Sequence, residues 1–403
     1  MSTIVEKGRG RYIMIERYLE KIIKEDLKEK MVFVSGPRQV GKTTLAINLA
    51  KETYPTSYAY LNWDNAVDRK QMINGLWQAN KKLFILDEIH KYRKWKNYLK
   101  GEYDKYKESF NILVTGSARL DIYRKGGDSL QGRYHAFRLY PLSVAELAGN
   151  KNKNFITFKK LHFDDASHQT FESLYKFGGF PEQFNKQNER DLRRWHLERV
   201  DRLIKEDIRD VESIRDISAM QVLVQLLPKR VGSLFSLNSL REDLQVTHKT
   251  MASWVEILEK FYYHFRIYPF KNKLHGSLKK EPKLFLWDWS ELEDEGARLE
   301  NMVAVHLLKF CHYLTDVEGY RAGLNFLKNK QKQEVDFLVT IDNAPWFCVE
   351  VKKSMERNIT SLKYYGTGLK IPYMYQVIDT RNTDLIKDNV RIISVEKFLG
   401  GLI

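Results

Sequence analysis

The pattern of apolar and polar positions is clearest in the first part of the chain. Short continuous apolar runs predict buried strands at residues 31–35, 57–62, 83–86 and 112–115. Helical spacing predicts a helix at residues 42–51 and another from residue 11 to about residue 30. Strands that alternate with helices are typical of a parallel sheet with crossover helices. The sequence therefore predicts the α/β class for residues 1–150.

The middle of the chain has a different pattern. Residues 157–213 are charged and helical, with a turn marked by the glycines and proline of Gly178–Pro181. Further helices are predicted at residues 220–227, 239–244 and 247–261. The extended, basic segment 265–286 that follows predicts a two-stranded wing.

The last part of the chain returns to a mixed pattern. An amphipathic helix that ends near residue 312 precedes predicted strands at 334–341 and 346–351. These changes of pattern predict an α/β core at 1–150, a helical lid at 151–215, a winged-helix-like module at 216–290 and a separate α/β domain at 291–403.

Composition supports a globular protein. Of the 403 residues, 43% are hydrophobic and 30% are charged, which provides enough apolar material for real cores. No run approaches the roughly 18 apolar residues of a membrane span, and the N-terminus lacks a signal-peptide core, so we expect a cytoplasmic protein without a membrane partner. The chain has only two cysteines, Cys311 and Cys348, which are too few for a zinc cluster or a disulfide framework, and both lie in apolar runs as small hydrophobic residues. The net charge of +15 is compatible with a nucleic-acid partner but does not define a reaction.

A phosphate-binding pattern follows the first predicted strand. Residues Gly36–Thr43 fit G-x-x-x-x-G-K-[ST] between a strand and a helix, which is the context that this motif requires. Backbone N–H groups would surround the phosphates, Lys42 would reach the β and γ phosphates, and Thr43 would ligate Mg²⁺. We expect ATP and Mg²⁺ to bind at Gly36, Pro37, Arg38, Gln39, Val40, Gly41, Lys42, Thr43 and Thr44.

Two more strands end in candidate catalytic residues. Asp87 and Glu88 follow the apolar run 83–86, at the end of the strand where α/β sheets bind ligands. We expect Asp87 to hold Mg²⁺ and Glu88 to polarise the attacking water, although such a pair is also common as a helix N-cap. Thr115 or Ser117 would sense the γ-phosphate, unless they form an ordinary strand-to-turn junction.

These residues resemble the bacterial and archaeal P-loop ATPases of the AAA type that carry an uncharacterised C-terminal domain. Besides the loop, the motifs that carry the resemblance are Tyr60–Asp64, Leu86–Lys91, Thr115–Ser117, Leu130–Arg133, Tyr140–Ser143 and Gly178–Glu182. The resemblance implies ATP hydrolysis and a homo-oligomer in which an arginine reaches a neighbour's site. Arg133 and Arg119 are the candidates for that arginine. No second-region arginine sensor is evident, which argues against a standard hexameric ring.

A second constellation lies near the C-terminus. A tight hairpin near Asn343 would place Asp336 opposite Glu350, with Lys352 on the same face as Glu350. With Glu300, these oxygens would suit Mg²⁺ or Mn²⁺. The pattern resembles the D-(x)n-E-x-K signature of the restriction-endonuclease-like fold. Three interpretations stay open: a metal site that cuts DNA or RNA, a degenerate nuclease fold kept for binding, and a solvated hairpin face.

Two regions are candidate nucleic-acid surfaces. The segment Thr247–Trp254 opens a helix as in winged helix-turn-helix modules, and a helical packing module is the alternative. Its wing would contribute Lys271, Lys273, His275, Lys279 and Lys280. The second region would combine base stacking with positive charge, unless it is a solvated helix face, and consists of Lys91, Arg93, Lys94, Trp95, Lys96, Tyr98 and Lys100.

The sequence therefore favours a cytoplasmic ATPase whose nucleic-acid partner is DNA rather than RNA and whose C-terminal domain is nuclease-like. One alternative is an ATP-controlled regulatory or defence switch whose C-terminal domain binds a macromolecule without cutting it. Another is a DNA-binding regulator in which hydrolysis acts as a timer.

Overall fold

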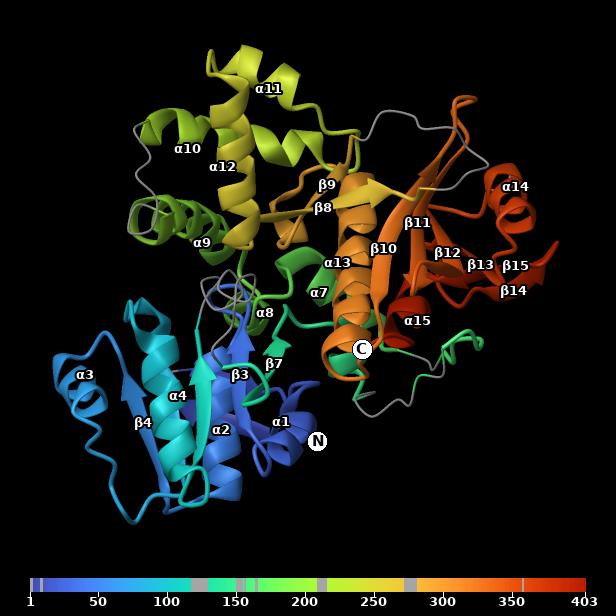
Figure 1. The fold of residues 1–403 in the computed structure, drawn as a ribbon. Helices are drawn as coiled ribbons and strands as arrows, with labels where there is room; N and C mark the ends of the chain where they lie inside the picture. The colour runs from blue at the N-terminus through green and yellow to red at the C-terminus, as the bar shows by residue number, and fades with distance from the viewer. Residues whose placement is uncertain are drawn as a thin grey trace. The chain divides into compact units, whose positions relative to one another are not determined.

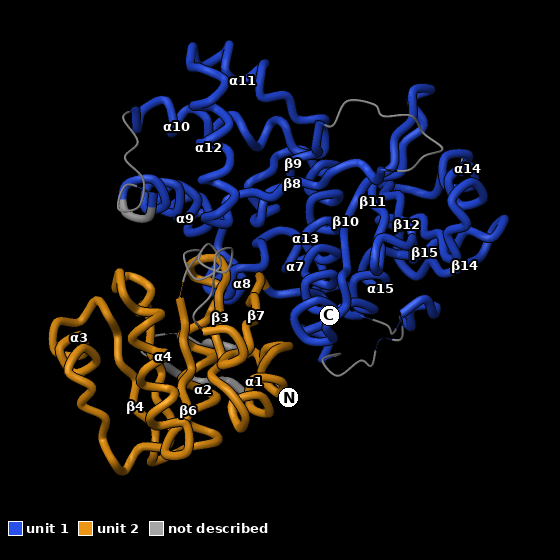
Figure 2. The backbone as a smooth tube through the Cα atoms, viewed as in Figure 1, with its two compact units in different colours: residues 1, 142–403 blue, residues 2–141 orange. Residues whose placement is uncertain are grey.

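The chain folds into two compact units. A computed structural model describes residues 3–7, 10–116, 130–149, 155, 157–163, 166–208, 216–271, 281–356 and 359–403. The units comprise residues 2–141 and residues 142–403 (Figure 2). Each unit contains its own large sheet.

The first unit is built on a five-stranded sheet with the order β4-β5-β6-β3-β7, in which every pair of strands is parallel. The strands are β3 Met31–Ser35, β4 Tyr58–Asn62, β5 Leu83–Asp87, β6 Asn111–Thr115 and β7 Tyr134–Arg138. The intervening helices are α1 Glu20–Asp26, α2 Lys42–Thr53, α3 Ala66–Ile73 and α4 Trp95–Tyr106. The α/β prediction for this part of the chain is confirmed. The sequence did not predict β7, because its Tyr-His-Ala-Phe-Arg sequence lacks a continuous apolar run.

The start of the chain differs from the prediction. The sequence predicted one helix from residue 11 to about residue 30, but β1 Thr3–Lys7 and β2 Gly10–Met14 form an antiparallel hairpin, and the helix is limited to α1. The backbone of residues 10–14 forms ladder hydrogen bonds with the backbone of residues 3–7. The spacing of apolar residues alone does not reveal this strand pairing.

The second unit begins with a mainly helical region. Its helices are α6 Val144–Leu147, α7 His168–Phe177, α8 Pro181–Lys186, α9 Glu189–Arg202, α10 Ile217–Leu226, α11 Leu237–Asp243 and α12 His248–Lys260. A π-helix at Leu203–Ile208 continues α9, and a 3₁₀ turn at Leu227–Arg230 follows α10. The side chains of Ser167, Asn188, Asp216 and Thr247 accept hydrogen bonds at the N-termini of α7, α9, α10 and α12. Each of these caps provides a partner for a backbone N–H group that the first turn of a helix leaves unpaired.

An eight-stranded mixed sheet forms the rest of the second unit, in the order β14-β15-β13-β12-β11-β10-β8-β9 (Figure 1). Its strands are β8 His264–Pro269, β9 Lys283–Leu286, β10 Ala322–Lys328, β11 Glu334–Ile341, β12 Ala344–Lys352, β13 Tyr373–Ile378, β14 Asp384–Lys387 and β15 Val390–Ser394. The helices are α13 Glu295–Asp316, α14 Thr360–Gly368 and α15 Val395–Gly400, and α13 packs against β10, β11 and β12.

The predicted wing is part of this sheet. β8 and β9 pair in the antiparallel sense, as a wing would require, but β8 also pairs with β10 in the parallel sense. The two strands therefore form one edge of the eight-stranded sheet and not a free hairpin. The sequence could not indicate this, because the partner strand lies more than 50 residues further along the chain.

A buried cluster of hydrogen-bonded polar side chains connects α6 to α13. Ser143 and Glu146 form a capping box, and the Lys309 ammonium donates hydrogen bonds to Glu146 Oε2 and, at 3.0 Å, to Ser143 Oγ. His306 Nδ1 donates to Met302 O at 2.8 Å, and His306 Nε2 accepts from the Val144 N–H at 3.2 Å. These contacts fit a neutral imidazole, and burial lowers the pKa of His306 to about 3.

Two further expectations concern cysteines and membranes. Cys311 and Cys348 are both buried, in agreement with their prediction as small hydrophobic residues. Within the described part of the chain, no helix has both the length and the apolar character needed to cross a lipid bilayer.

Candidate functional site

The backbone of the phosphate loop depends on two glycines. Gly36 has a φ of 141°, and a Cβ at this position would lie 2.1 Å from Leu139 O, so no other residue fits. Gly41 has a φ of 98° and is the N-cap of α2. The chain can therefore turn sharply from β3 into the helix, with the helix N-terminus behind the loop.

Lys42 lies across this loop. Its ammonium donates to Gly36 O at 2.9 Å and to Pro37 O at 2.6 Å, and the side chain is buried. These two carbonyl groups keep the charged end of the Lys42 side chain at the loop. The neighbouring positions of the motif continue the loop through Arg38, Gln39 and Val40, and Thr44 is exposed in the first turn of α2.

Three hydroxyl groups converge on the carboxylate of Asp87 at the end of β5. Thr43 Oγ1 and the Tyr60 hydroxyl donate to Asp87 Oδ2 at 2.9 and 2.8 Å. Thr115 Oγ1, which comes from the end of β6, donates to Asp87 Oδ1 at 2.6 Å. Burial and the Asp87 carboxylate raise the pKa of Tyr60, so its phenol stays protonated and can donate. The structure thus brings Thr43, Asp87 and Thr115 together at the carboxyl edge of the sheet.

Glu88 lies next to this group in an unusual backbone conformation. Its φ is 59°, in the left-handed region that favours glycine, and its N–H donates to Thr115 O at 2.9 Å. Glu88 Oε2 lies 3.4 Å from His90 Nε2. Burial raises the pKa of Glu88; the Lys42 ammonium opposes the increase and Asp87 adds to it. A half-buried carboxylate with a raised pKa beside a phosphate loop suits a general base.

Arg17 is a residue of this site that sequence analysis missed. Its buried guanidinium donates to Val40 O in the phosphate loop at 2.7 Å and also to Tyr140 O beyond β7. One side chain therefore ties the loop to the segment that leaves the sheet. The two acceptors lie 23 and 123 positions along the chain, so no short motif could have identified this role.

Arg133 lies away from the phosphate loop of its own chain. It immediately precedes β7, at the amino edge of the parallel sheet, whereas the loop follows the carboxyl end of β3. Its guanidinium forms an exposed two-point ion pair with Asp104 at 2.7 and 3.0 Å. Its predicted contact with nucleotide therefore requires a neighbouring chain. The other candidates, Arg119 and Ser117, lie outside the described residues.

The C-terminal constellation lies on the hairpin of β11 and β12. Phe337 pairs with Val349, and the same register places Asp336 opposite Glu350. Asp336 Oδ2 accepts a hydrogen bond from the Val351 N–H at 2.8 Å, and Lys352 Nζ lies 3.5 Å from Glu350 Oε1. The structure thus brings Asp336, Glu350 and Lys352 together.

A lysine that the sequence analysis did not consider lies among these carboxylates. Lys283 Nζ, at the start of β9, lies 2.6 Å from Glu334 Oε1, 3.3 Å from Glu300 Oε1 and 3.7 Å from Asp336 Oδ1. Burial alone would lower its pKa, but the three carboxylates raise it overall. Lys283 therefore carries its charge inside the cluster. A lysine in the apolar strand Lys-Leu-Phe-Leu was the available signal.

The cluster does not fit Mg²⁺ or Mn²⁺ in this arrangement. Burial raises the pKa of Glu300 to about 7, and Asp336 adds to the increase. Burial also raises the pKa of Glu350 to about 7, although the Lys352 ammonium opposes it. Among the residues that the structure describes, no three side chains of the metal-ligating types are arranged to hold a metal ion. The Lys283 ammonium, and not a metal ion, neutralises Glu300 and Asp336 here.

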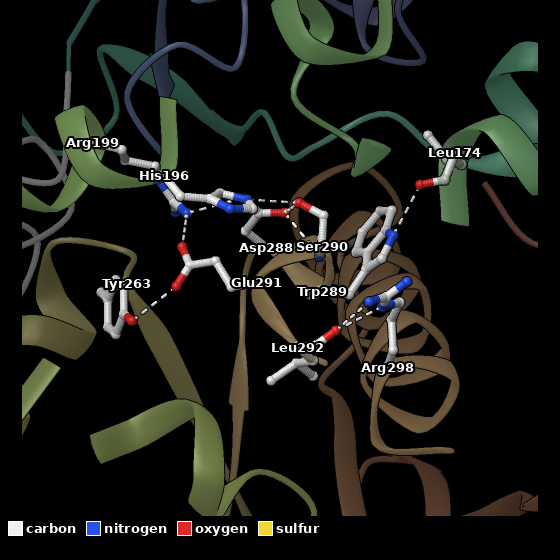
Figure 3. A network of polar contacts seen from close by, with 10 residues as sticks. All are labelled: Leu174, His196, Arg199, Tyr263, Asp288, Trp289, Ser290, Glu291, Leu292 and Arg298. Carbon is white, nitrogen blue, oxygen red and sulfur yellow. Dashed lines mark hydrogen bonds and ion pairs between the residues drawn. The ribbon is translucent and has the colours of Figure 1, made fainter. Parts of the chain in front are cut away.

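A polar network joins α9 to the residues that follow β9 (Figure 3). Its charged and hydroxyl side chains are His196, Arg199, Tyr263, Asp288, Ser290 and Glu291. Ser290 Oγ donates to Asp288 Oδ1 at 2.6 Å, and His196 Nε2 faces both Ser290 Oγ, at 3.0 Å, and Asp288 Oδ2, at 3.4 Å. In a nucleophilic triad the serine would donate to the histidine, and the carboxylate would hold the other ring nitrogen. The network is therefore structural.

The candidate nucleic-acid surface on α4 lacks accessible stacking groups. Trp95 is buried against Phe33, and the Tyr98 hydroxyl donates to Met72 O. The surrounding basic residues thus belong to a solvated helix face, and Lys91 pairs with Asp64 at 2.6 Å. In the predicted wing, Lys271 is exposed, whereas Lys273, His275, Lys279 and Lys280 lie outside the described residues.

Comparisons with known proteins agree with the nucleotide site. Residues 28–148 match the AAA domain family AAA_14. The chain thus contains an AAA-type P-loop domain. Residues 168–292 match a domain of unknown function, DUF8612, and residues 295–398 match another, DUF4143. The expected combination of an AAA-type ATPase domain and an uncharacterised C-terminal domain is confirmed, whereas the restriction-endonuclease-like fold stays a prediction.

Similar proteins exist in other organisms. An uncharacterised protein of Methanocaldococcus jannaschii is 26% identical over 426 residues, which covers 91% of this chain and 88% of that protein. A Walker-type ATPase of Pyrococcus abyssi is 12% identical, with a TM-score of 0.40 over 67% of this chain and 92% of that chain. The RuvB Holliday junction branch migration motor of Thermotoga maritima is 19% identical, with a TM-score of 0.33 over 62% of this chain and 90% of that chain. Structural likeness this weak carries no argument about function.

Proposed function

We propose that this protein binds and hydrolyses ATP with Mg²⁺. The observation that carries the proposal is the 2.9 Å contact between Thr43 Oγ1 and Asp87 Oδ2. These two oxygens come from the phosphate loop and from the adjacent strand, and hard oxygen ligands suit Mg²⁺. The AAA domain family at residues 28–148 supports the same proposal.

We assign a separate role in binding or hydrolysis to each side chain around the loop. Lys42 would exchange its two carbonyl acceptors for phosphate oxygens, and Thr43 and Asp87 would hold the metal ion. Bound Mg²⁺ would neutralise charge on the phosphates. Glu88, with its raised pKa, takes a proton from the attacking water, and Thr115 keeps the Asp87 carboxylate in place.

The test is ATP turnover by the purified full-length chain. Lys42→Ala removes the ammonium that contacts the β and γ phosphates, so we expect it to abolish turnover while the protein stays folded. Phosphate release by the wild type, measured with and without Mg²⁺, provides the reference. Equal turnover by Lys42→Ala and the wild type would refute the proposal.

We further propose that the nucleotide state controls the binding of nucleic acid, DNA in preference to RNA, and that the C-terminal domain does not cut it in the arrangement described. The net charge of +15 supports association with a polyanion. The Lys283 ammonium among the carboxylates argues against metal-dependent cleavage. This is the switch interpretation of the sequence, with cleavage as its alternative.

Binding and cleavage can be measured on the same substrates. Labelled duplex DNA, single-stranded DNA and RNA are titrated at two salt concentrations with and without ATP, and each is then incubated with Mg²⁺ or Mn²⁺. We expect salt-sensitive binding without cleavage. Cleavage that is lost in Glu350→Ala would instead support the nuclease interpretation. Light scattering of the same samples tests whether ATP promotes a homo-oligomer.

A further inference from the structure

We propose that Lys283 masks a latent divalent-cation site formed by Glu300, Asp336 and Glu350. The inference concerns the C-terminal cluster described above and rests on those carboxylates being its ligands. It does not depend on whether the protein hydrolyses ATP. In the wild type the Lys283 ammonium occupies the place of a metal ion among the carboxylates, and replacing Lys283 with a neutral residue exposes the metal site.

The backbone holds Lys283 firmly in this place. Lys283 pairs with Ile267 of β8, and an isolated bridge joins it to Leu234 on its other side. The Pro282 carbonyl accepts from the Phe235 N–H at 2.7 Å. Only 3% of the residue is exposed. The ammonium is therefore a built part of the cluster, unlike a surface lysine that samples many positions.

The ammonium and a metal ion would compete for the same oxygens. Lys283 lies 3.3 Å from Glu300 Oε1 and 3.7 Å from Asp336 Oδ1. A divalent ion would need these atoms at about 2.0–2.6 Å. A divalent cation that binds beside a fixed ammonium also experiences strong repulsion, because few waters separate the two charges. Metal binding and an undisturbed Lys283 are therefore incompatible.

One carboxylate oxygen is left available for a ligand. Glu350 is 8% exposed, and its Oε2 is buried with no hydrogen-bond partner among the described residues. A buried carboxylate oxygen without a partner is costly, and a metal ion is one of the groups that can satisfy it. Asp336 lies opposite Glu350 in the hairpin, so the oxygen belongs to the cluster that contains Lys283.

The charge of the cluster supports the same conclusion. Its carboxylates are Glu300, Glu334, Asp336, Glu350 and Glu356, and its ammonium groups are Lys283, Lys328 and Lys352. Five negative and three positive groups leave a formal charge of −2. Replacing Lys283 with a neutral residue makes this charge −3. The cluster without Lys283 therefore attracts a divalent cation more strongly.

The test uses Mn²⁺ alone as the probe and nucleotide-free, full-length protein. Lys283→Met keeps most of the side-chain volume and removes the charge. We expect it to bind Mn²⁺ at least about tenfold more tightly than the wild type, because a unit positive charge is removed from beside the ion. Isothermal titration calorimetry measures the affinity. Mn²⁺ binding is assigned to the C-terminal cluster only if it is lost when Glu350→Gln is combined with the other substitution. Mn²⁺ that binds at the phosphate loop would not respond to Glu350→Gln.

Two further variants complete the design. Lys328→Met is the matched control, because Lys328 contacts Glu334, which is not one of the three proposed ligands, at 2.5 Å, and its more exposed ammonium is screened by solvent, so we expect less than a threefold change. Lys283→Gln serves if Lys283→Met does not fold. It also removes the positive charge, and its amide can donate hydrogen bonds to the buried carboxylates, so we expect it to strengthen Glu350-dependent Mn²⁺ binding as well.

Each outcome has a distinct meaning. Tighter, Glu350-dependent binding by Lys283→Met, or by Lys283→Gln where Lys283→Met does not fold, supports the inference. Equal Glu350-dependent binding by the wild type and the folded variant overturns it while leaving a functional C-terminal metal site. The absence of such binding in all variants overturns the inference and the nuclease alternative together. ATP turnover is unaffected by any of these results, so the proposed ATPase is tested separately.

Discussion

Replacing Arg17 with alanine tests whether this side chain holds the phosphate loop in its binding conformation. The guanidinium bridges Val40 O in the loop and Tyr140 O after β7, and both bonds are buried. Alanine removes both donors and leaves two carbonyl groups that need new partners. Without these two hydrogen bonds, we expect the loop to adopt the backbone conformation that surrounds phosphate in a smaller fraction of the molecules.

The expected magnitude follows from the two hydrogen bonds. A hydrogen bond to a charged group contributes about 1.5–3 kcal/mol, so losing both costs at least about 3 kcal/mol. If half of this cost falls on the loop conformation, the Kd for MgATP rises about tenfold, and if all of it does, the rise is about 100-fold. Arg17→Lys keeps the charge but not the planar fork, so we expect an intermediate value.

Fluorescent ATP titration of the folded variants gives these dissociation constants. Arg391→Ala is the matched control: its exposed two-point ion pair with Asp384, at 2.7 and 2.8 Å, belongs to the second unit, so we expect less than about a twofold change in affinity. Circular dichroism confirms that each variant is folded. If folded Arg17→Ala bound MgATP within threefold of the wild type, Arg17 would not position the loop.

Three further predictions concern catalysis, the buried ion pair and pH. Glu88→Gln should lower kcat about 10²- to 10⁴-fold and leave the Kd for MgATP within threefold of the wild type, measured by phosphate release and ATP titration, because it removes only the proton acceptor. Glu146→Gln should destabilise the second unit by about 3–5 kcal/mol in urea unfolding because it leaves the buried Lys309 ammonium without its carboxylate, and adding Lys309→Met should restore most of the loss. Burial lowers the pKa of His306 to about 3 in the folded state, so below about pH 6.5 only the unfolded chain binds a proton at this residue. Between pH 7.5 and pH 5 the free energy of unfolding of the wild type should therefore fall by about 2 kcal/mol relative to that of His306→Gln, measured by urea unfolding at each pH. A difference between the two proteins that does not change with pH would refute the neutral imidazole.

The sequence identified the features that depend on neighbouring residues. The loop from Gly36 to Thr43 is contiguous, and the flanking strand and helix follow from apolar spacing within the same short segment. Asp87 is identified in the same way, because it ends a buried strand. The hairpin that places Asp336 opposite Glu350 is local too, but its turn alone would pair Asp336 with Val349, and an irregularity between Val339 and Thr340 shifts the register by one residue.

Features that depend on distant segments were missed or misassigned. The β8 and β9 pair looks like a free wing until β10 is placed beside it. The N-terminal segment looks helical until β1 pairs with β2. Trp95 looked available for stacking because the sequence shows the charges around it but not the core beneath it. In each case the deciding partner is a surface or a strand that the local pattern does not contain.

The most informative misses are buried cations. Hydrophobic patterning treats lysine and arginine as surface residues, yet Arg17, Lys283 and Lys309 are buried, and each has polar partners that are distant in sequence. A buried cation is tolerated only when such partners neutralise or solvate it. A lysine inside an apolar strand or helix, as in Lys283-Leu-Phe-Leu, therefore predicts that acidic side chains converge on it from elsewhere. It does not say which ones, and for Lys283 that choice separates an internally neutralised cluster from a metal site.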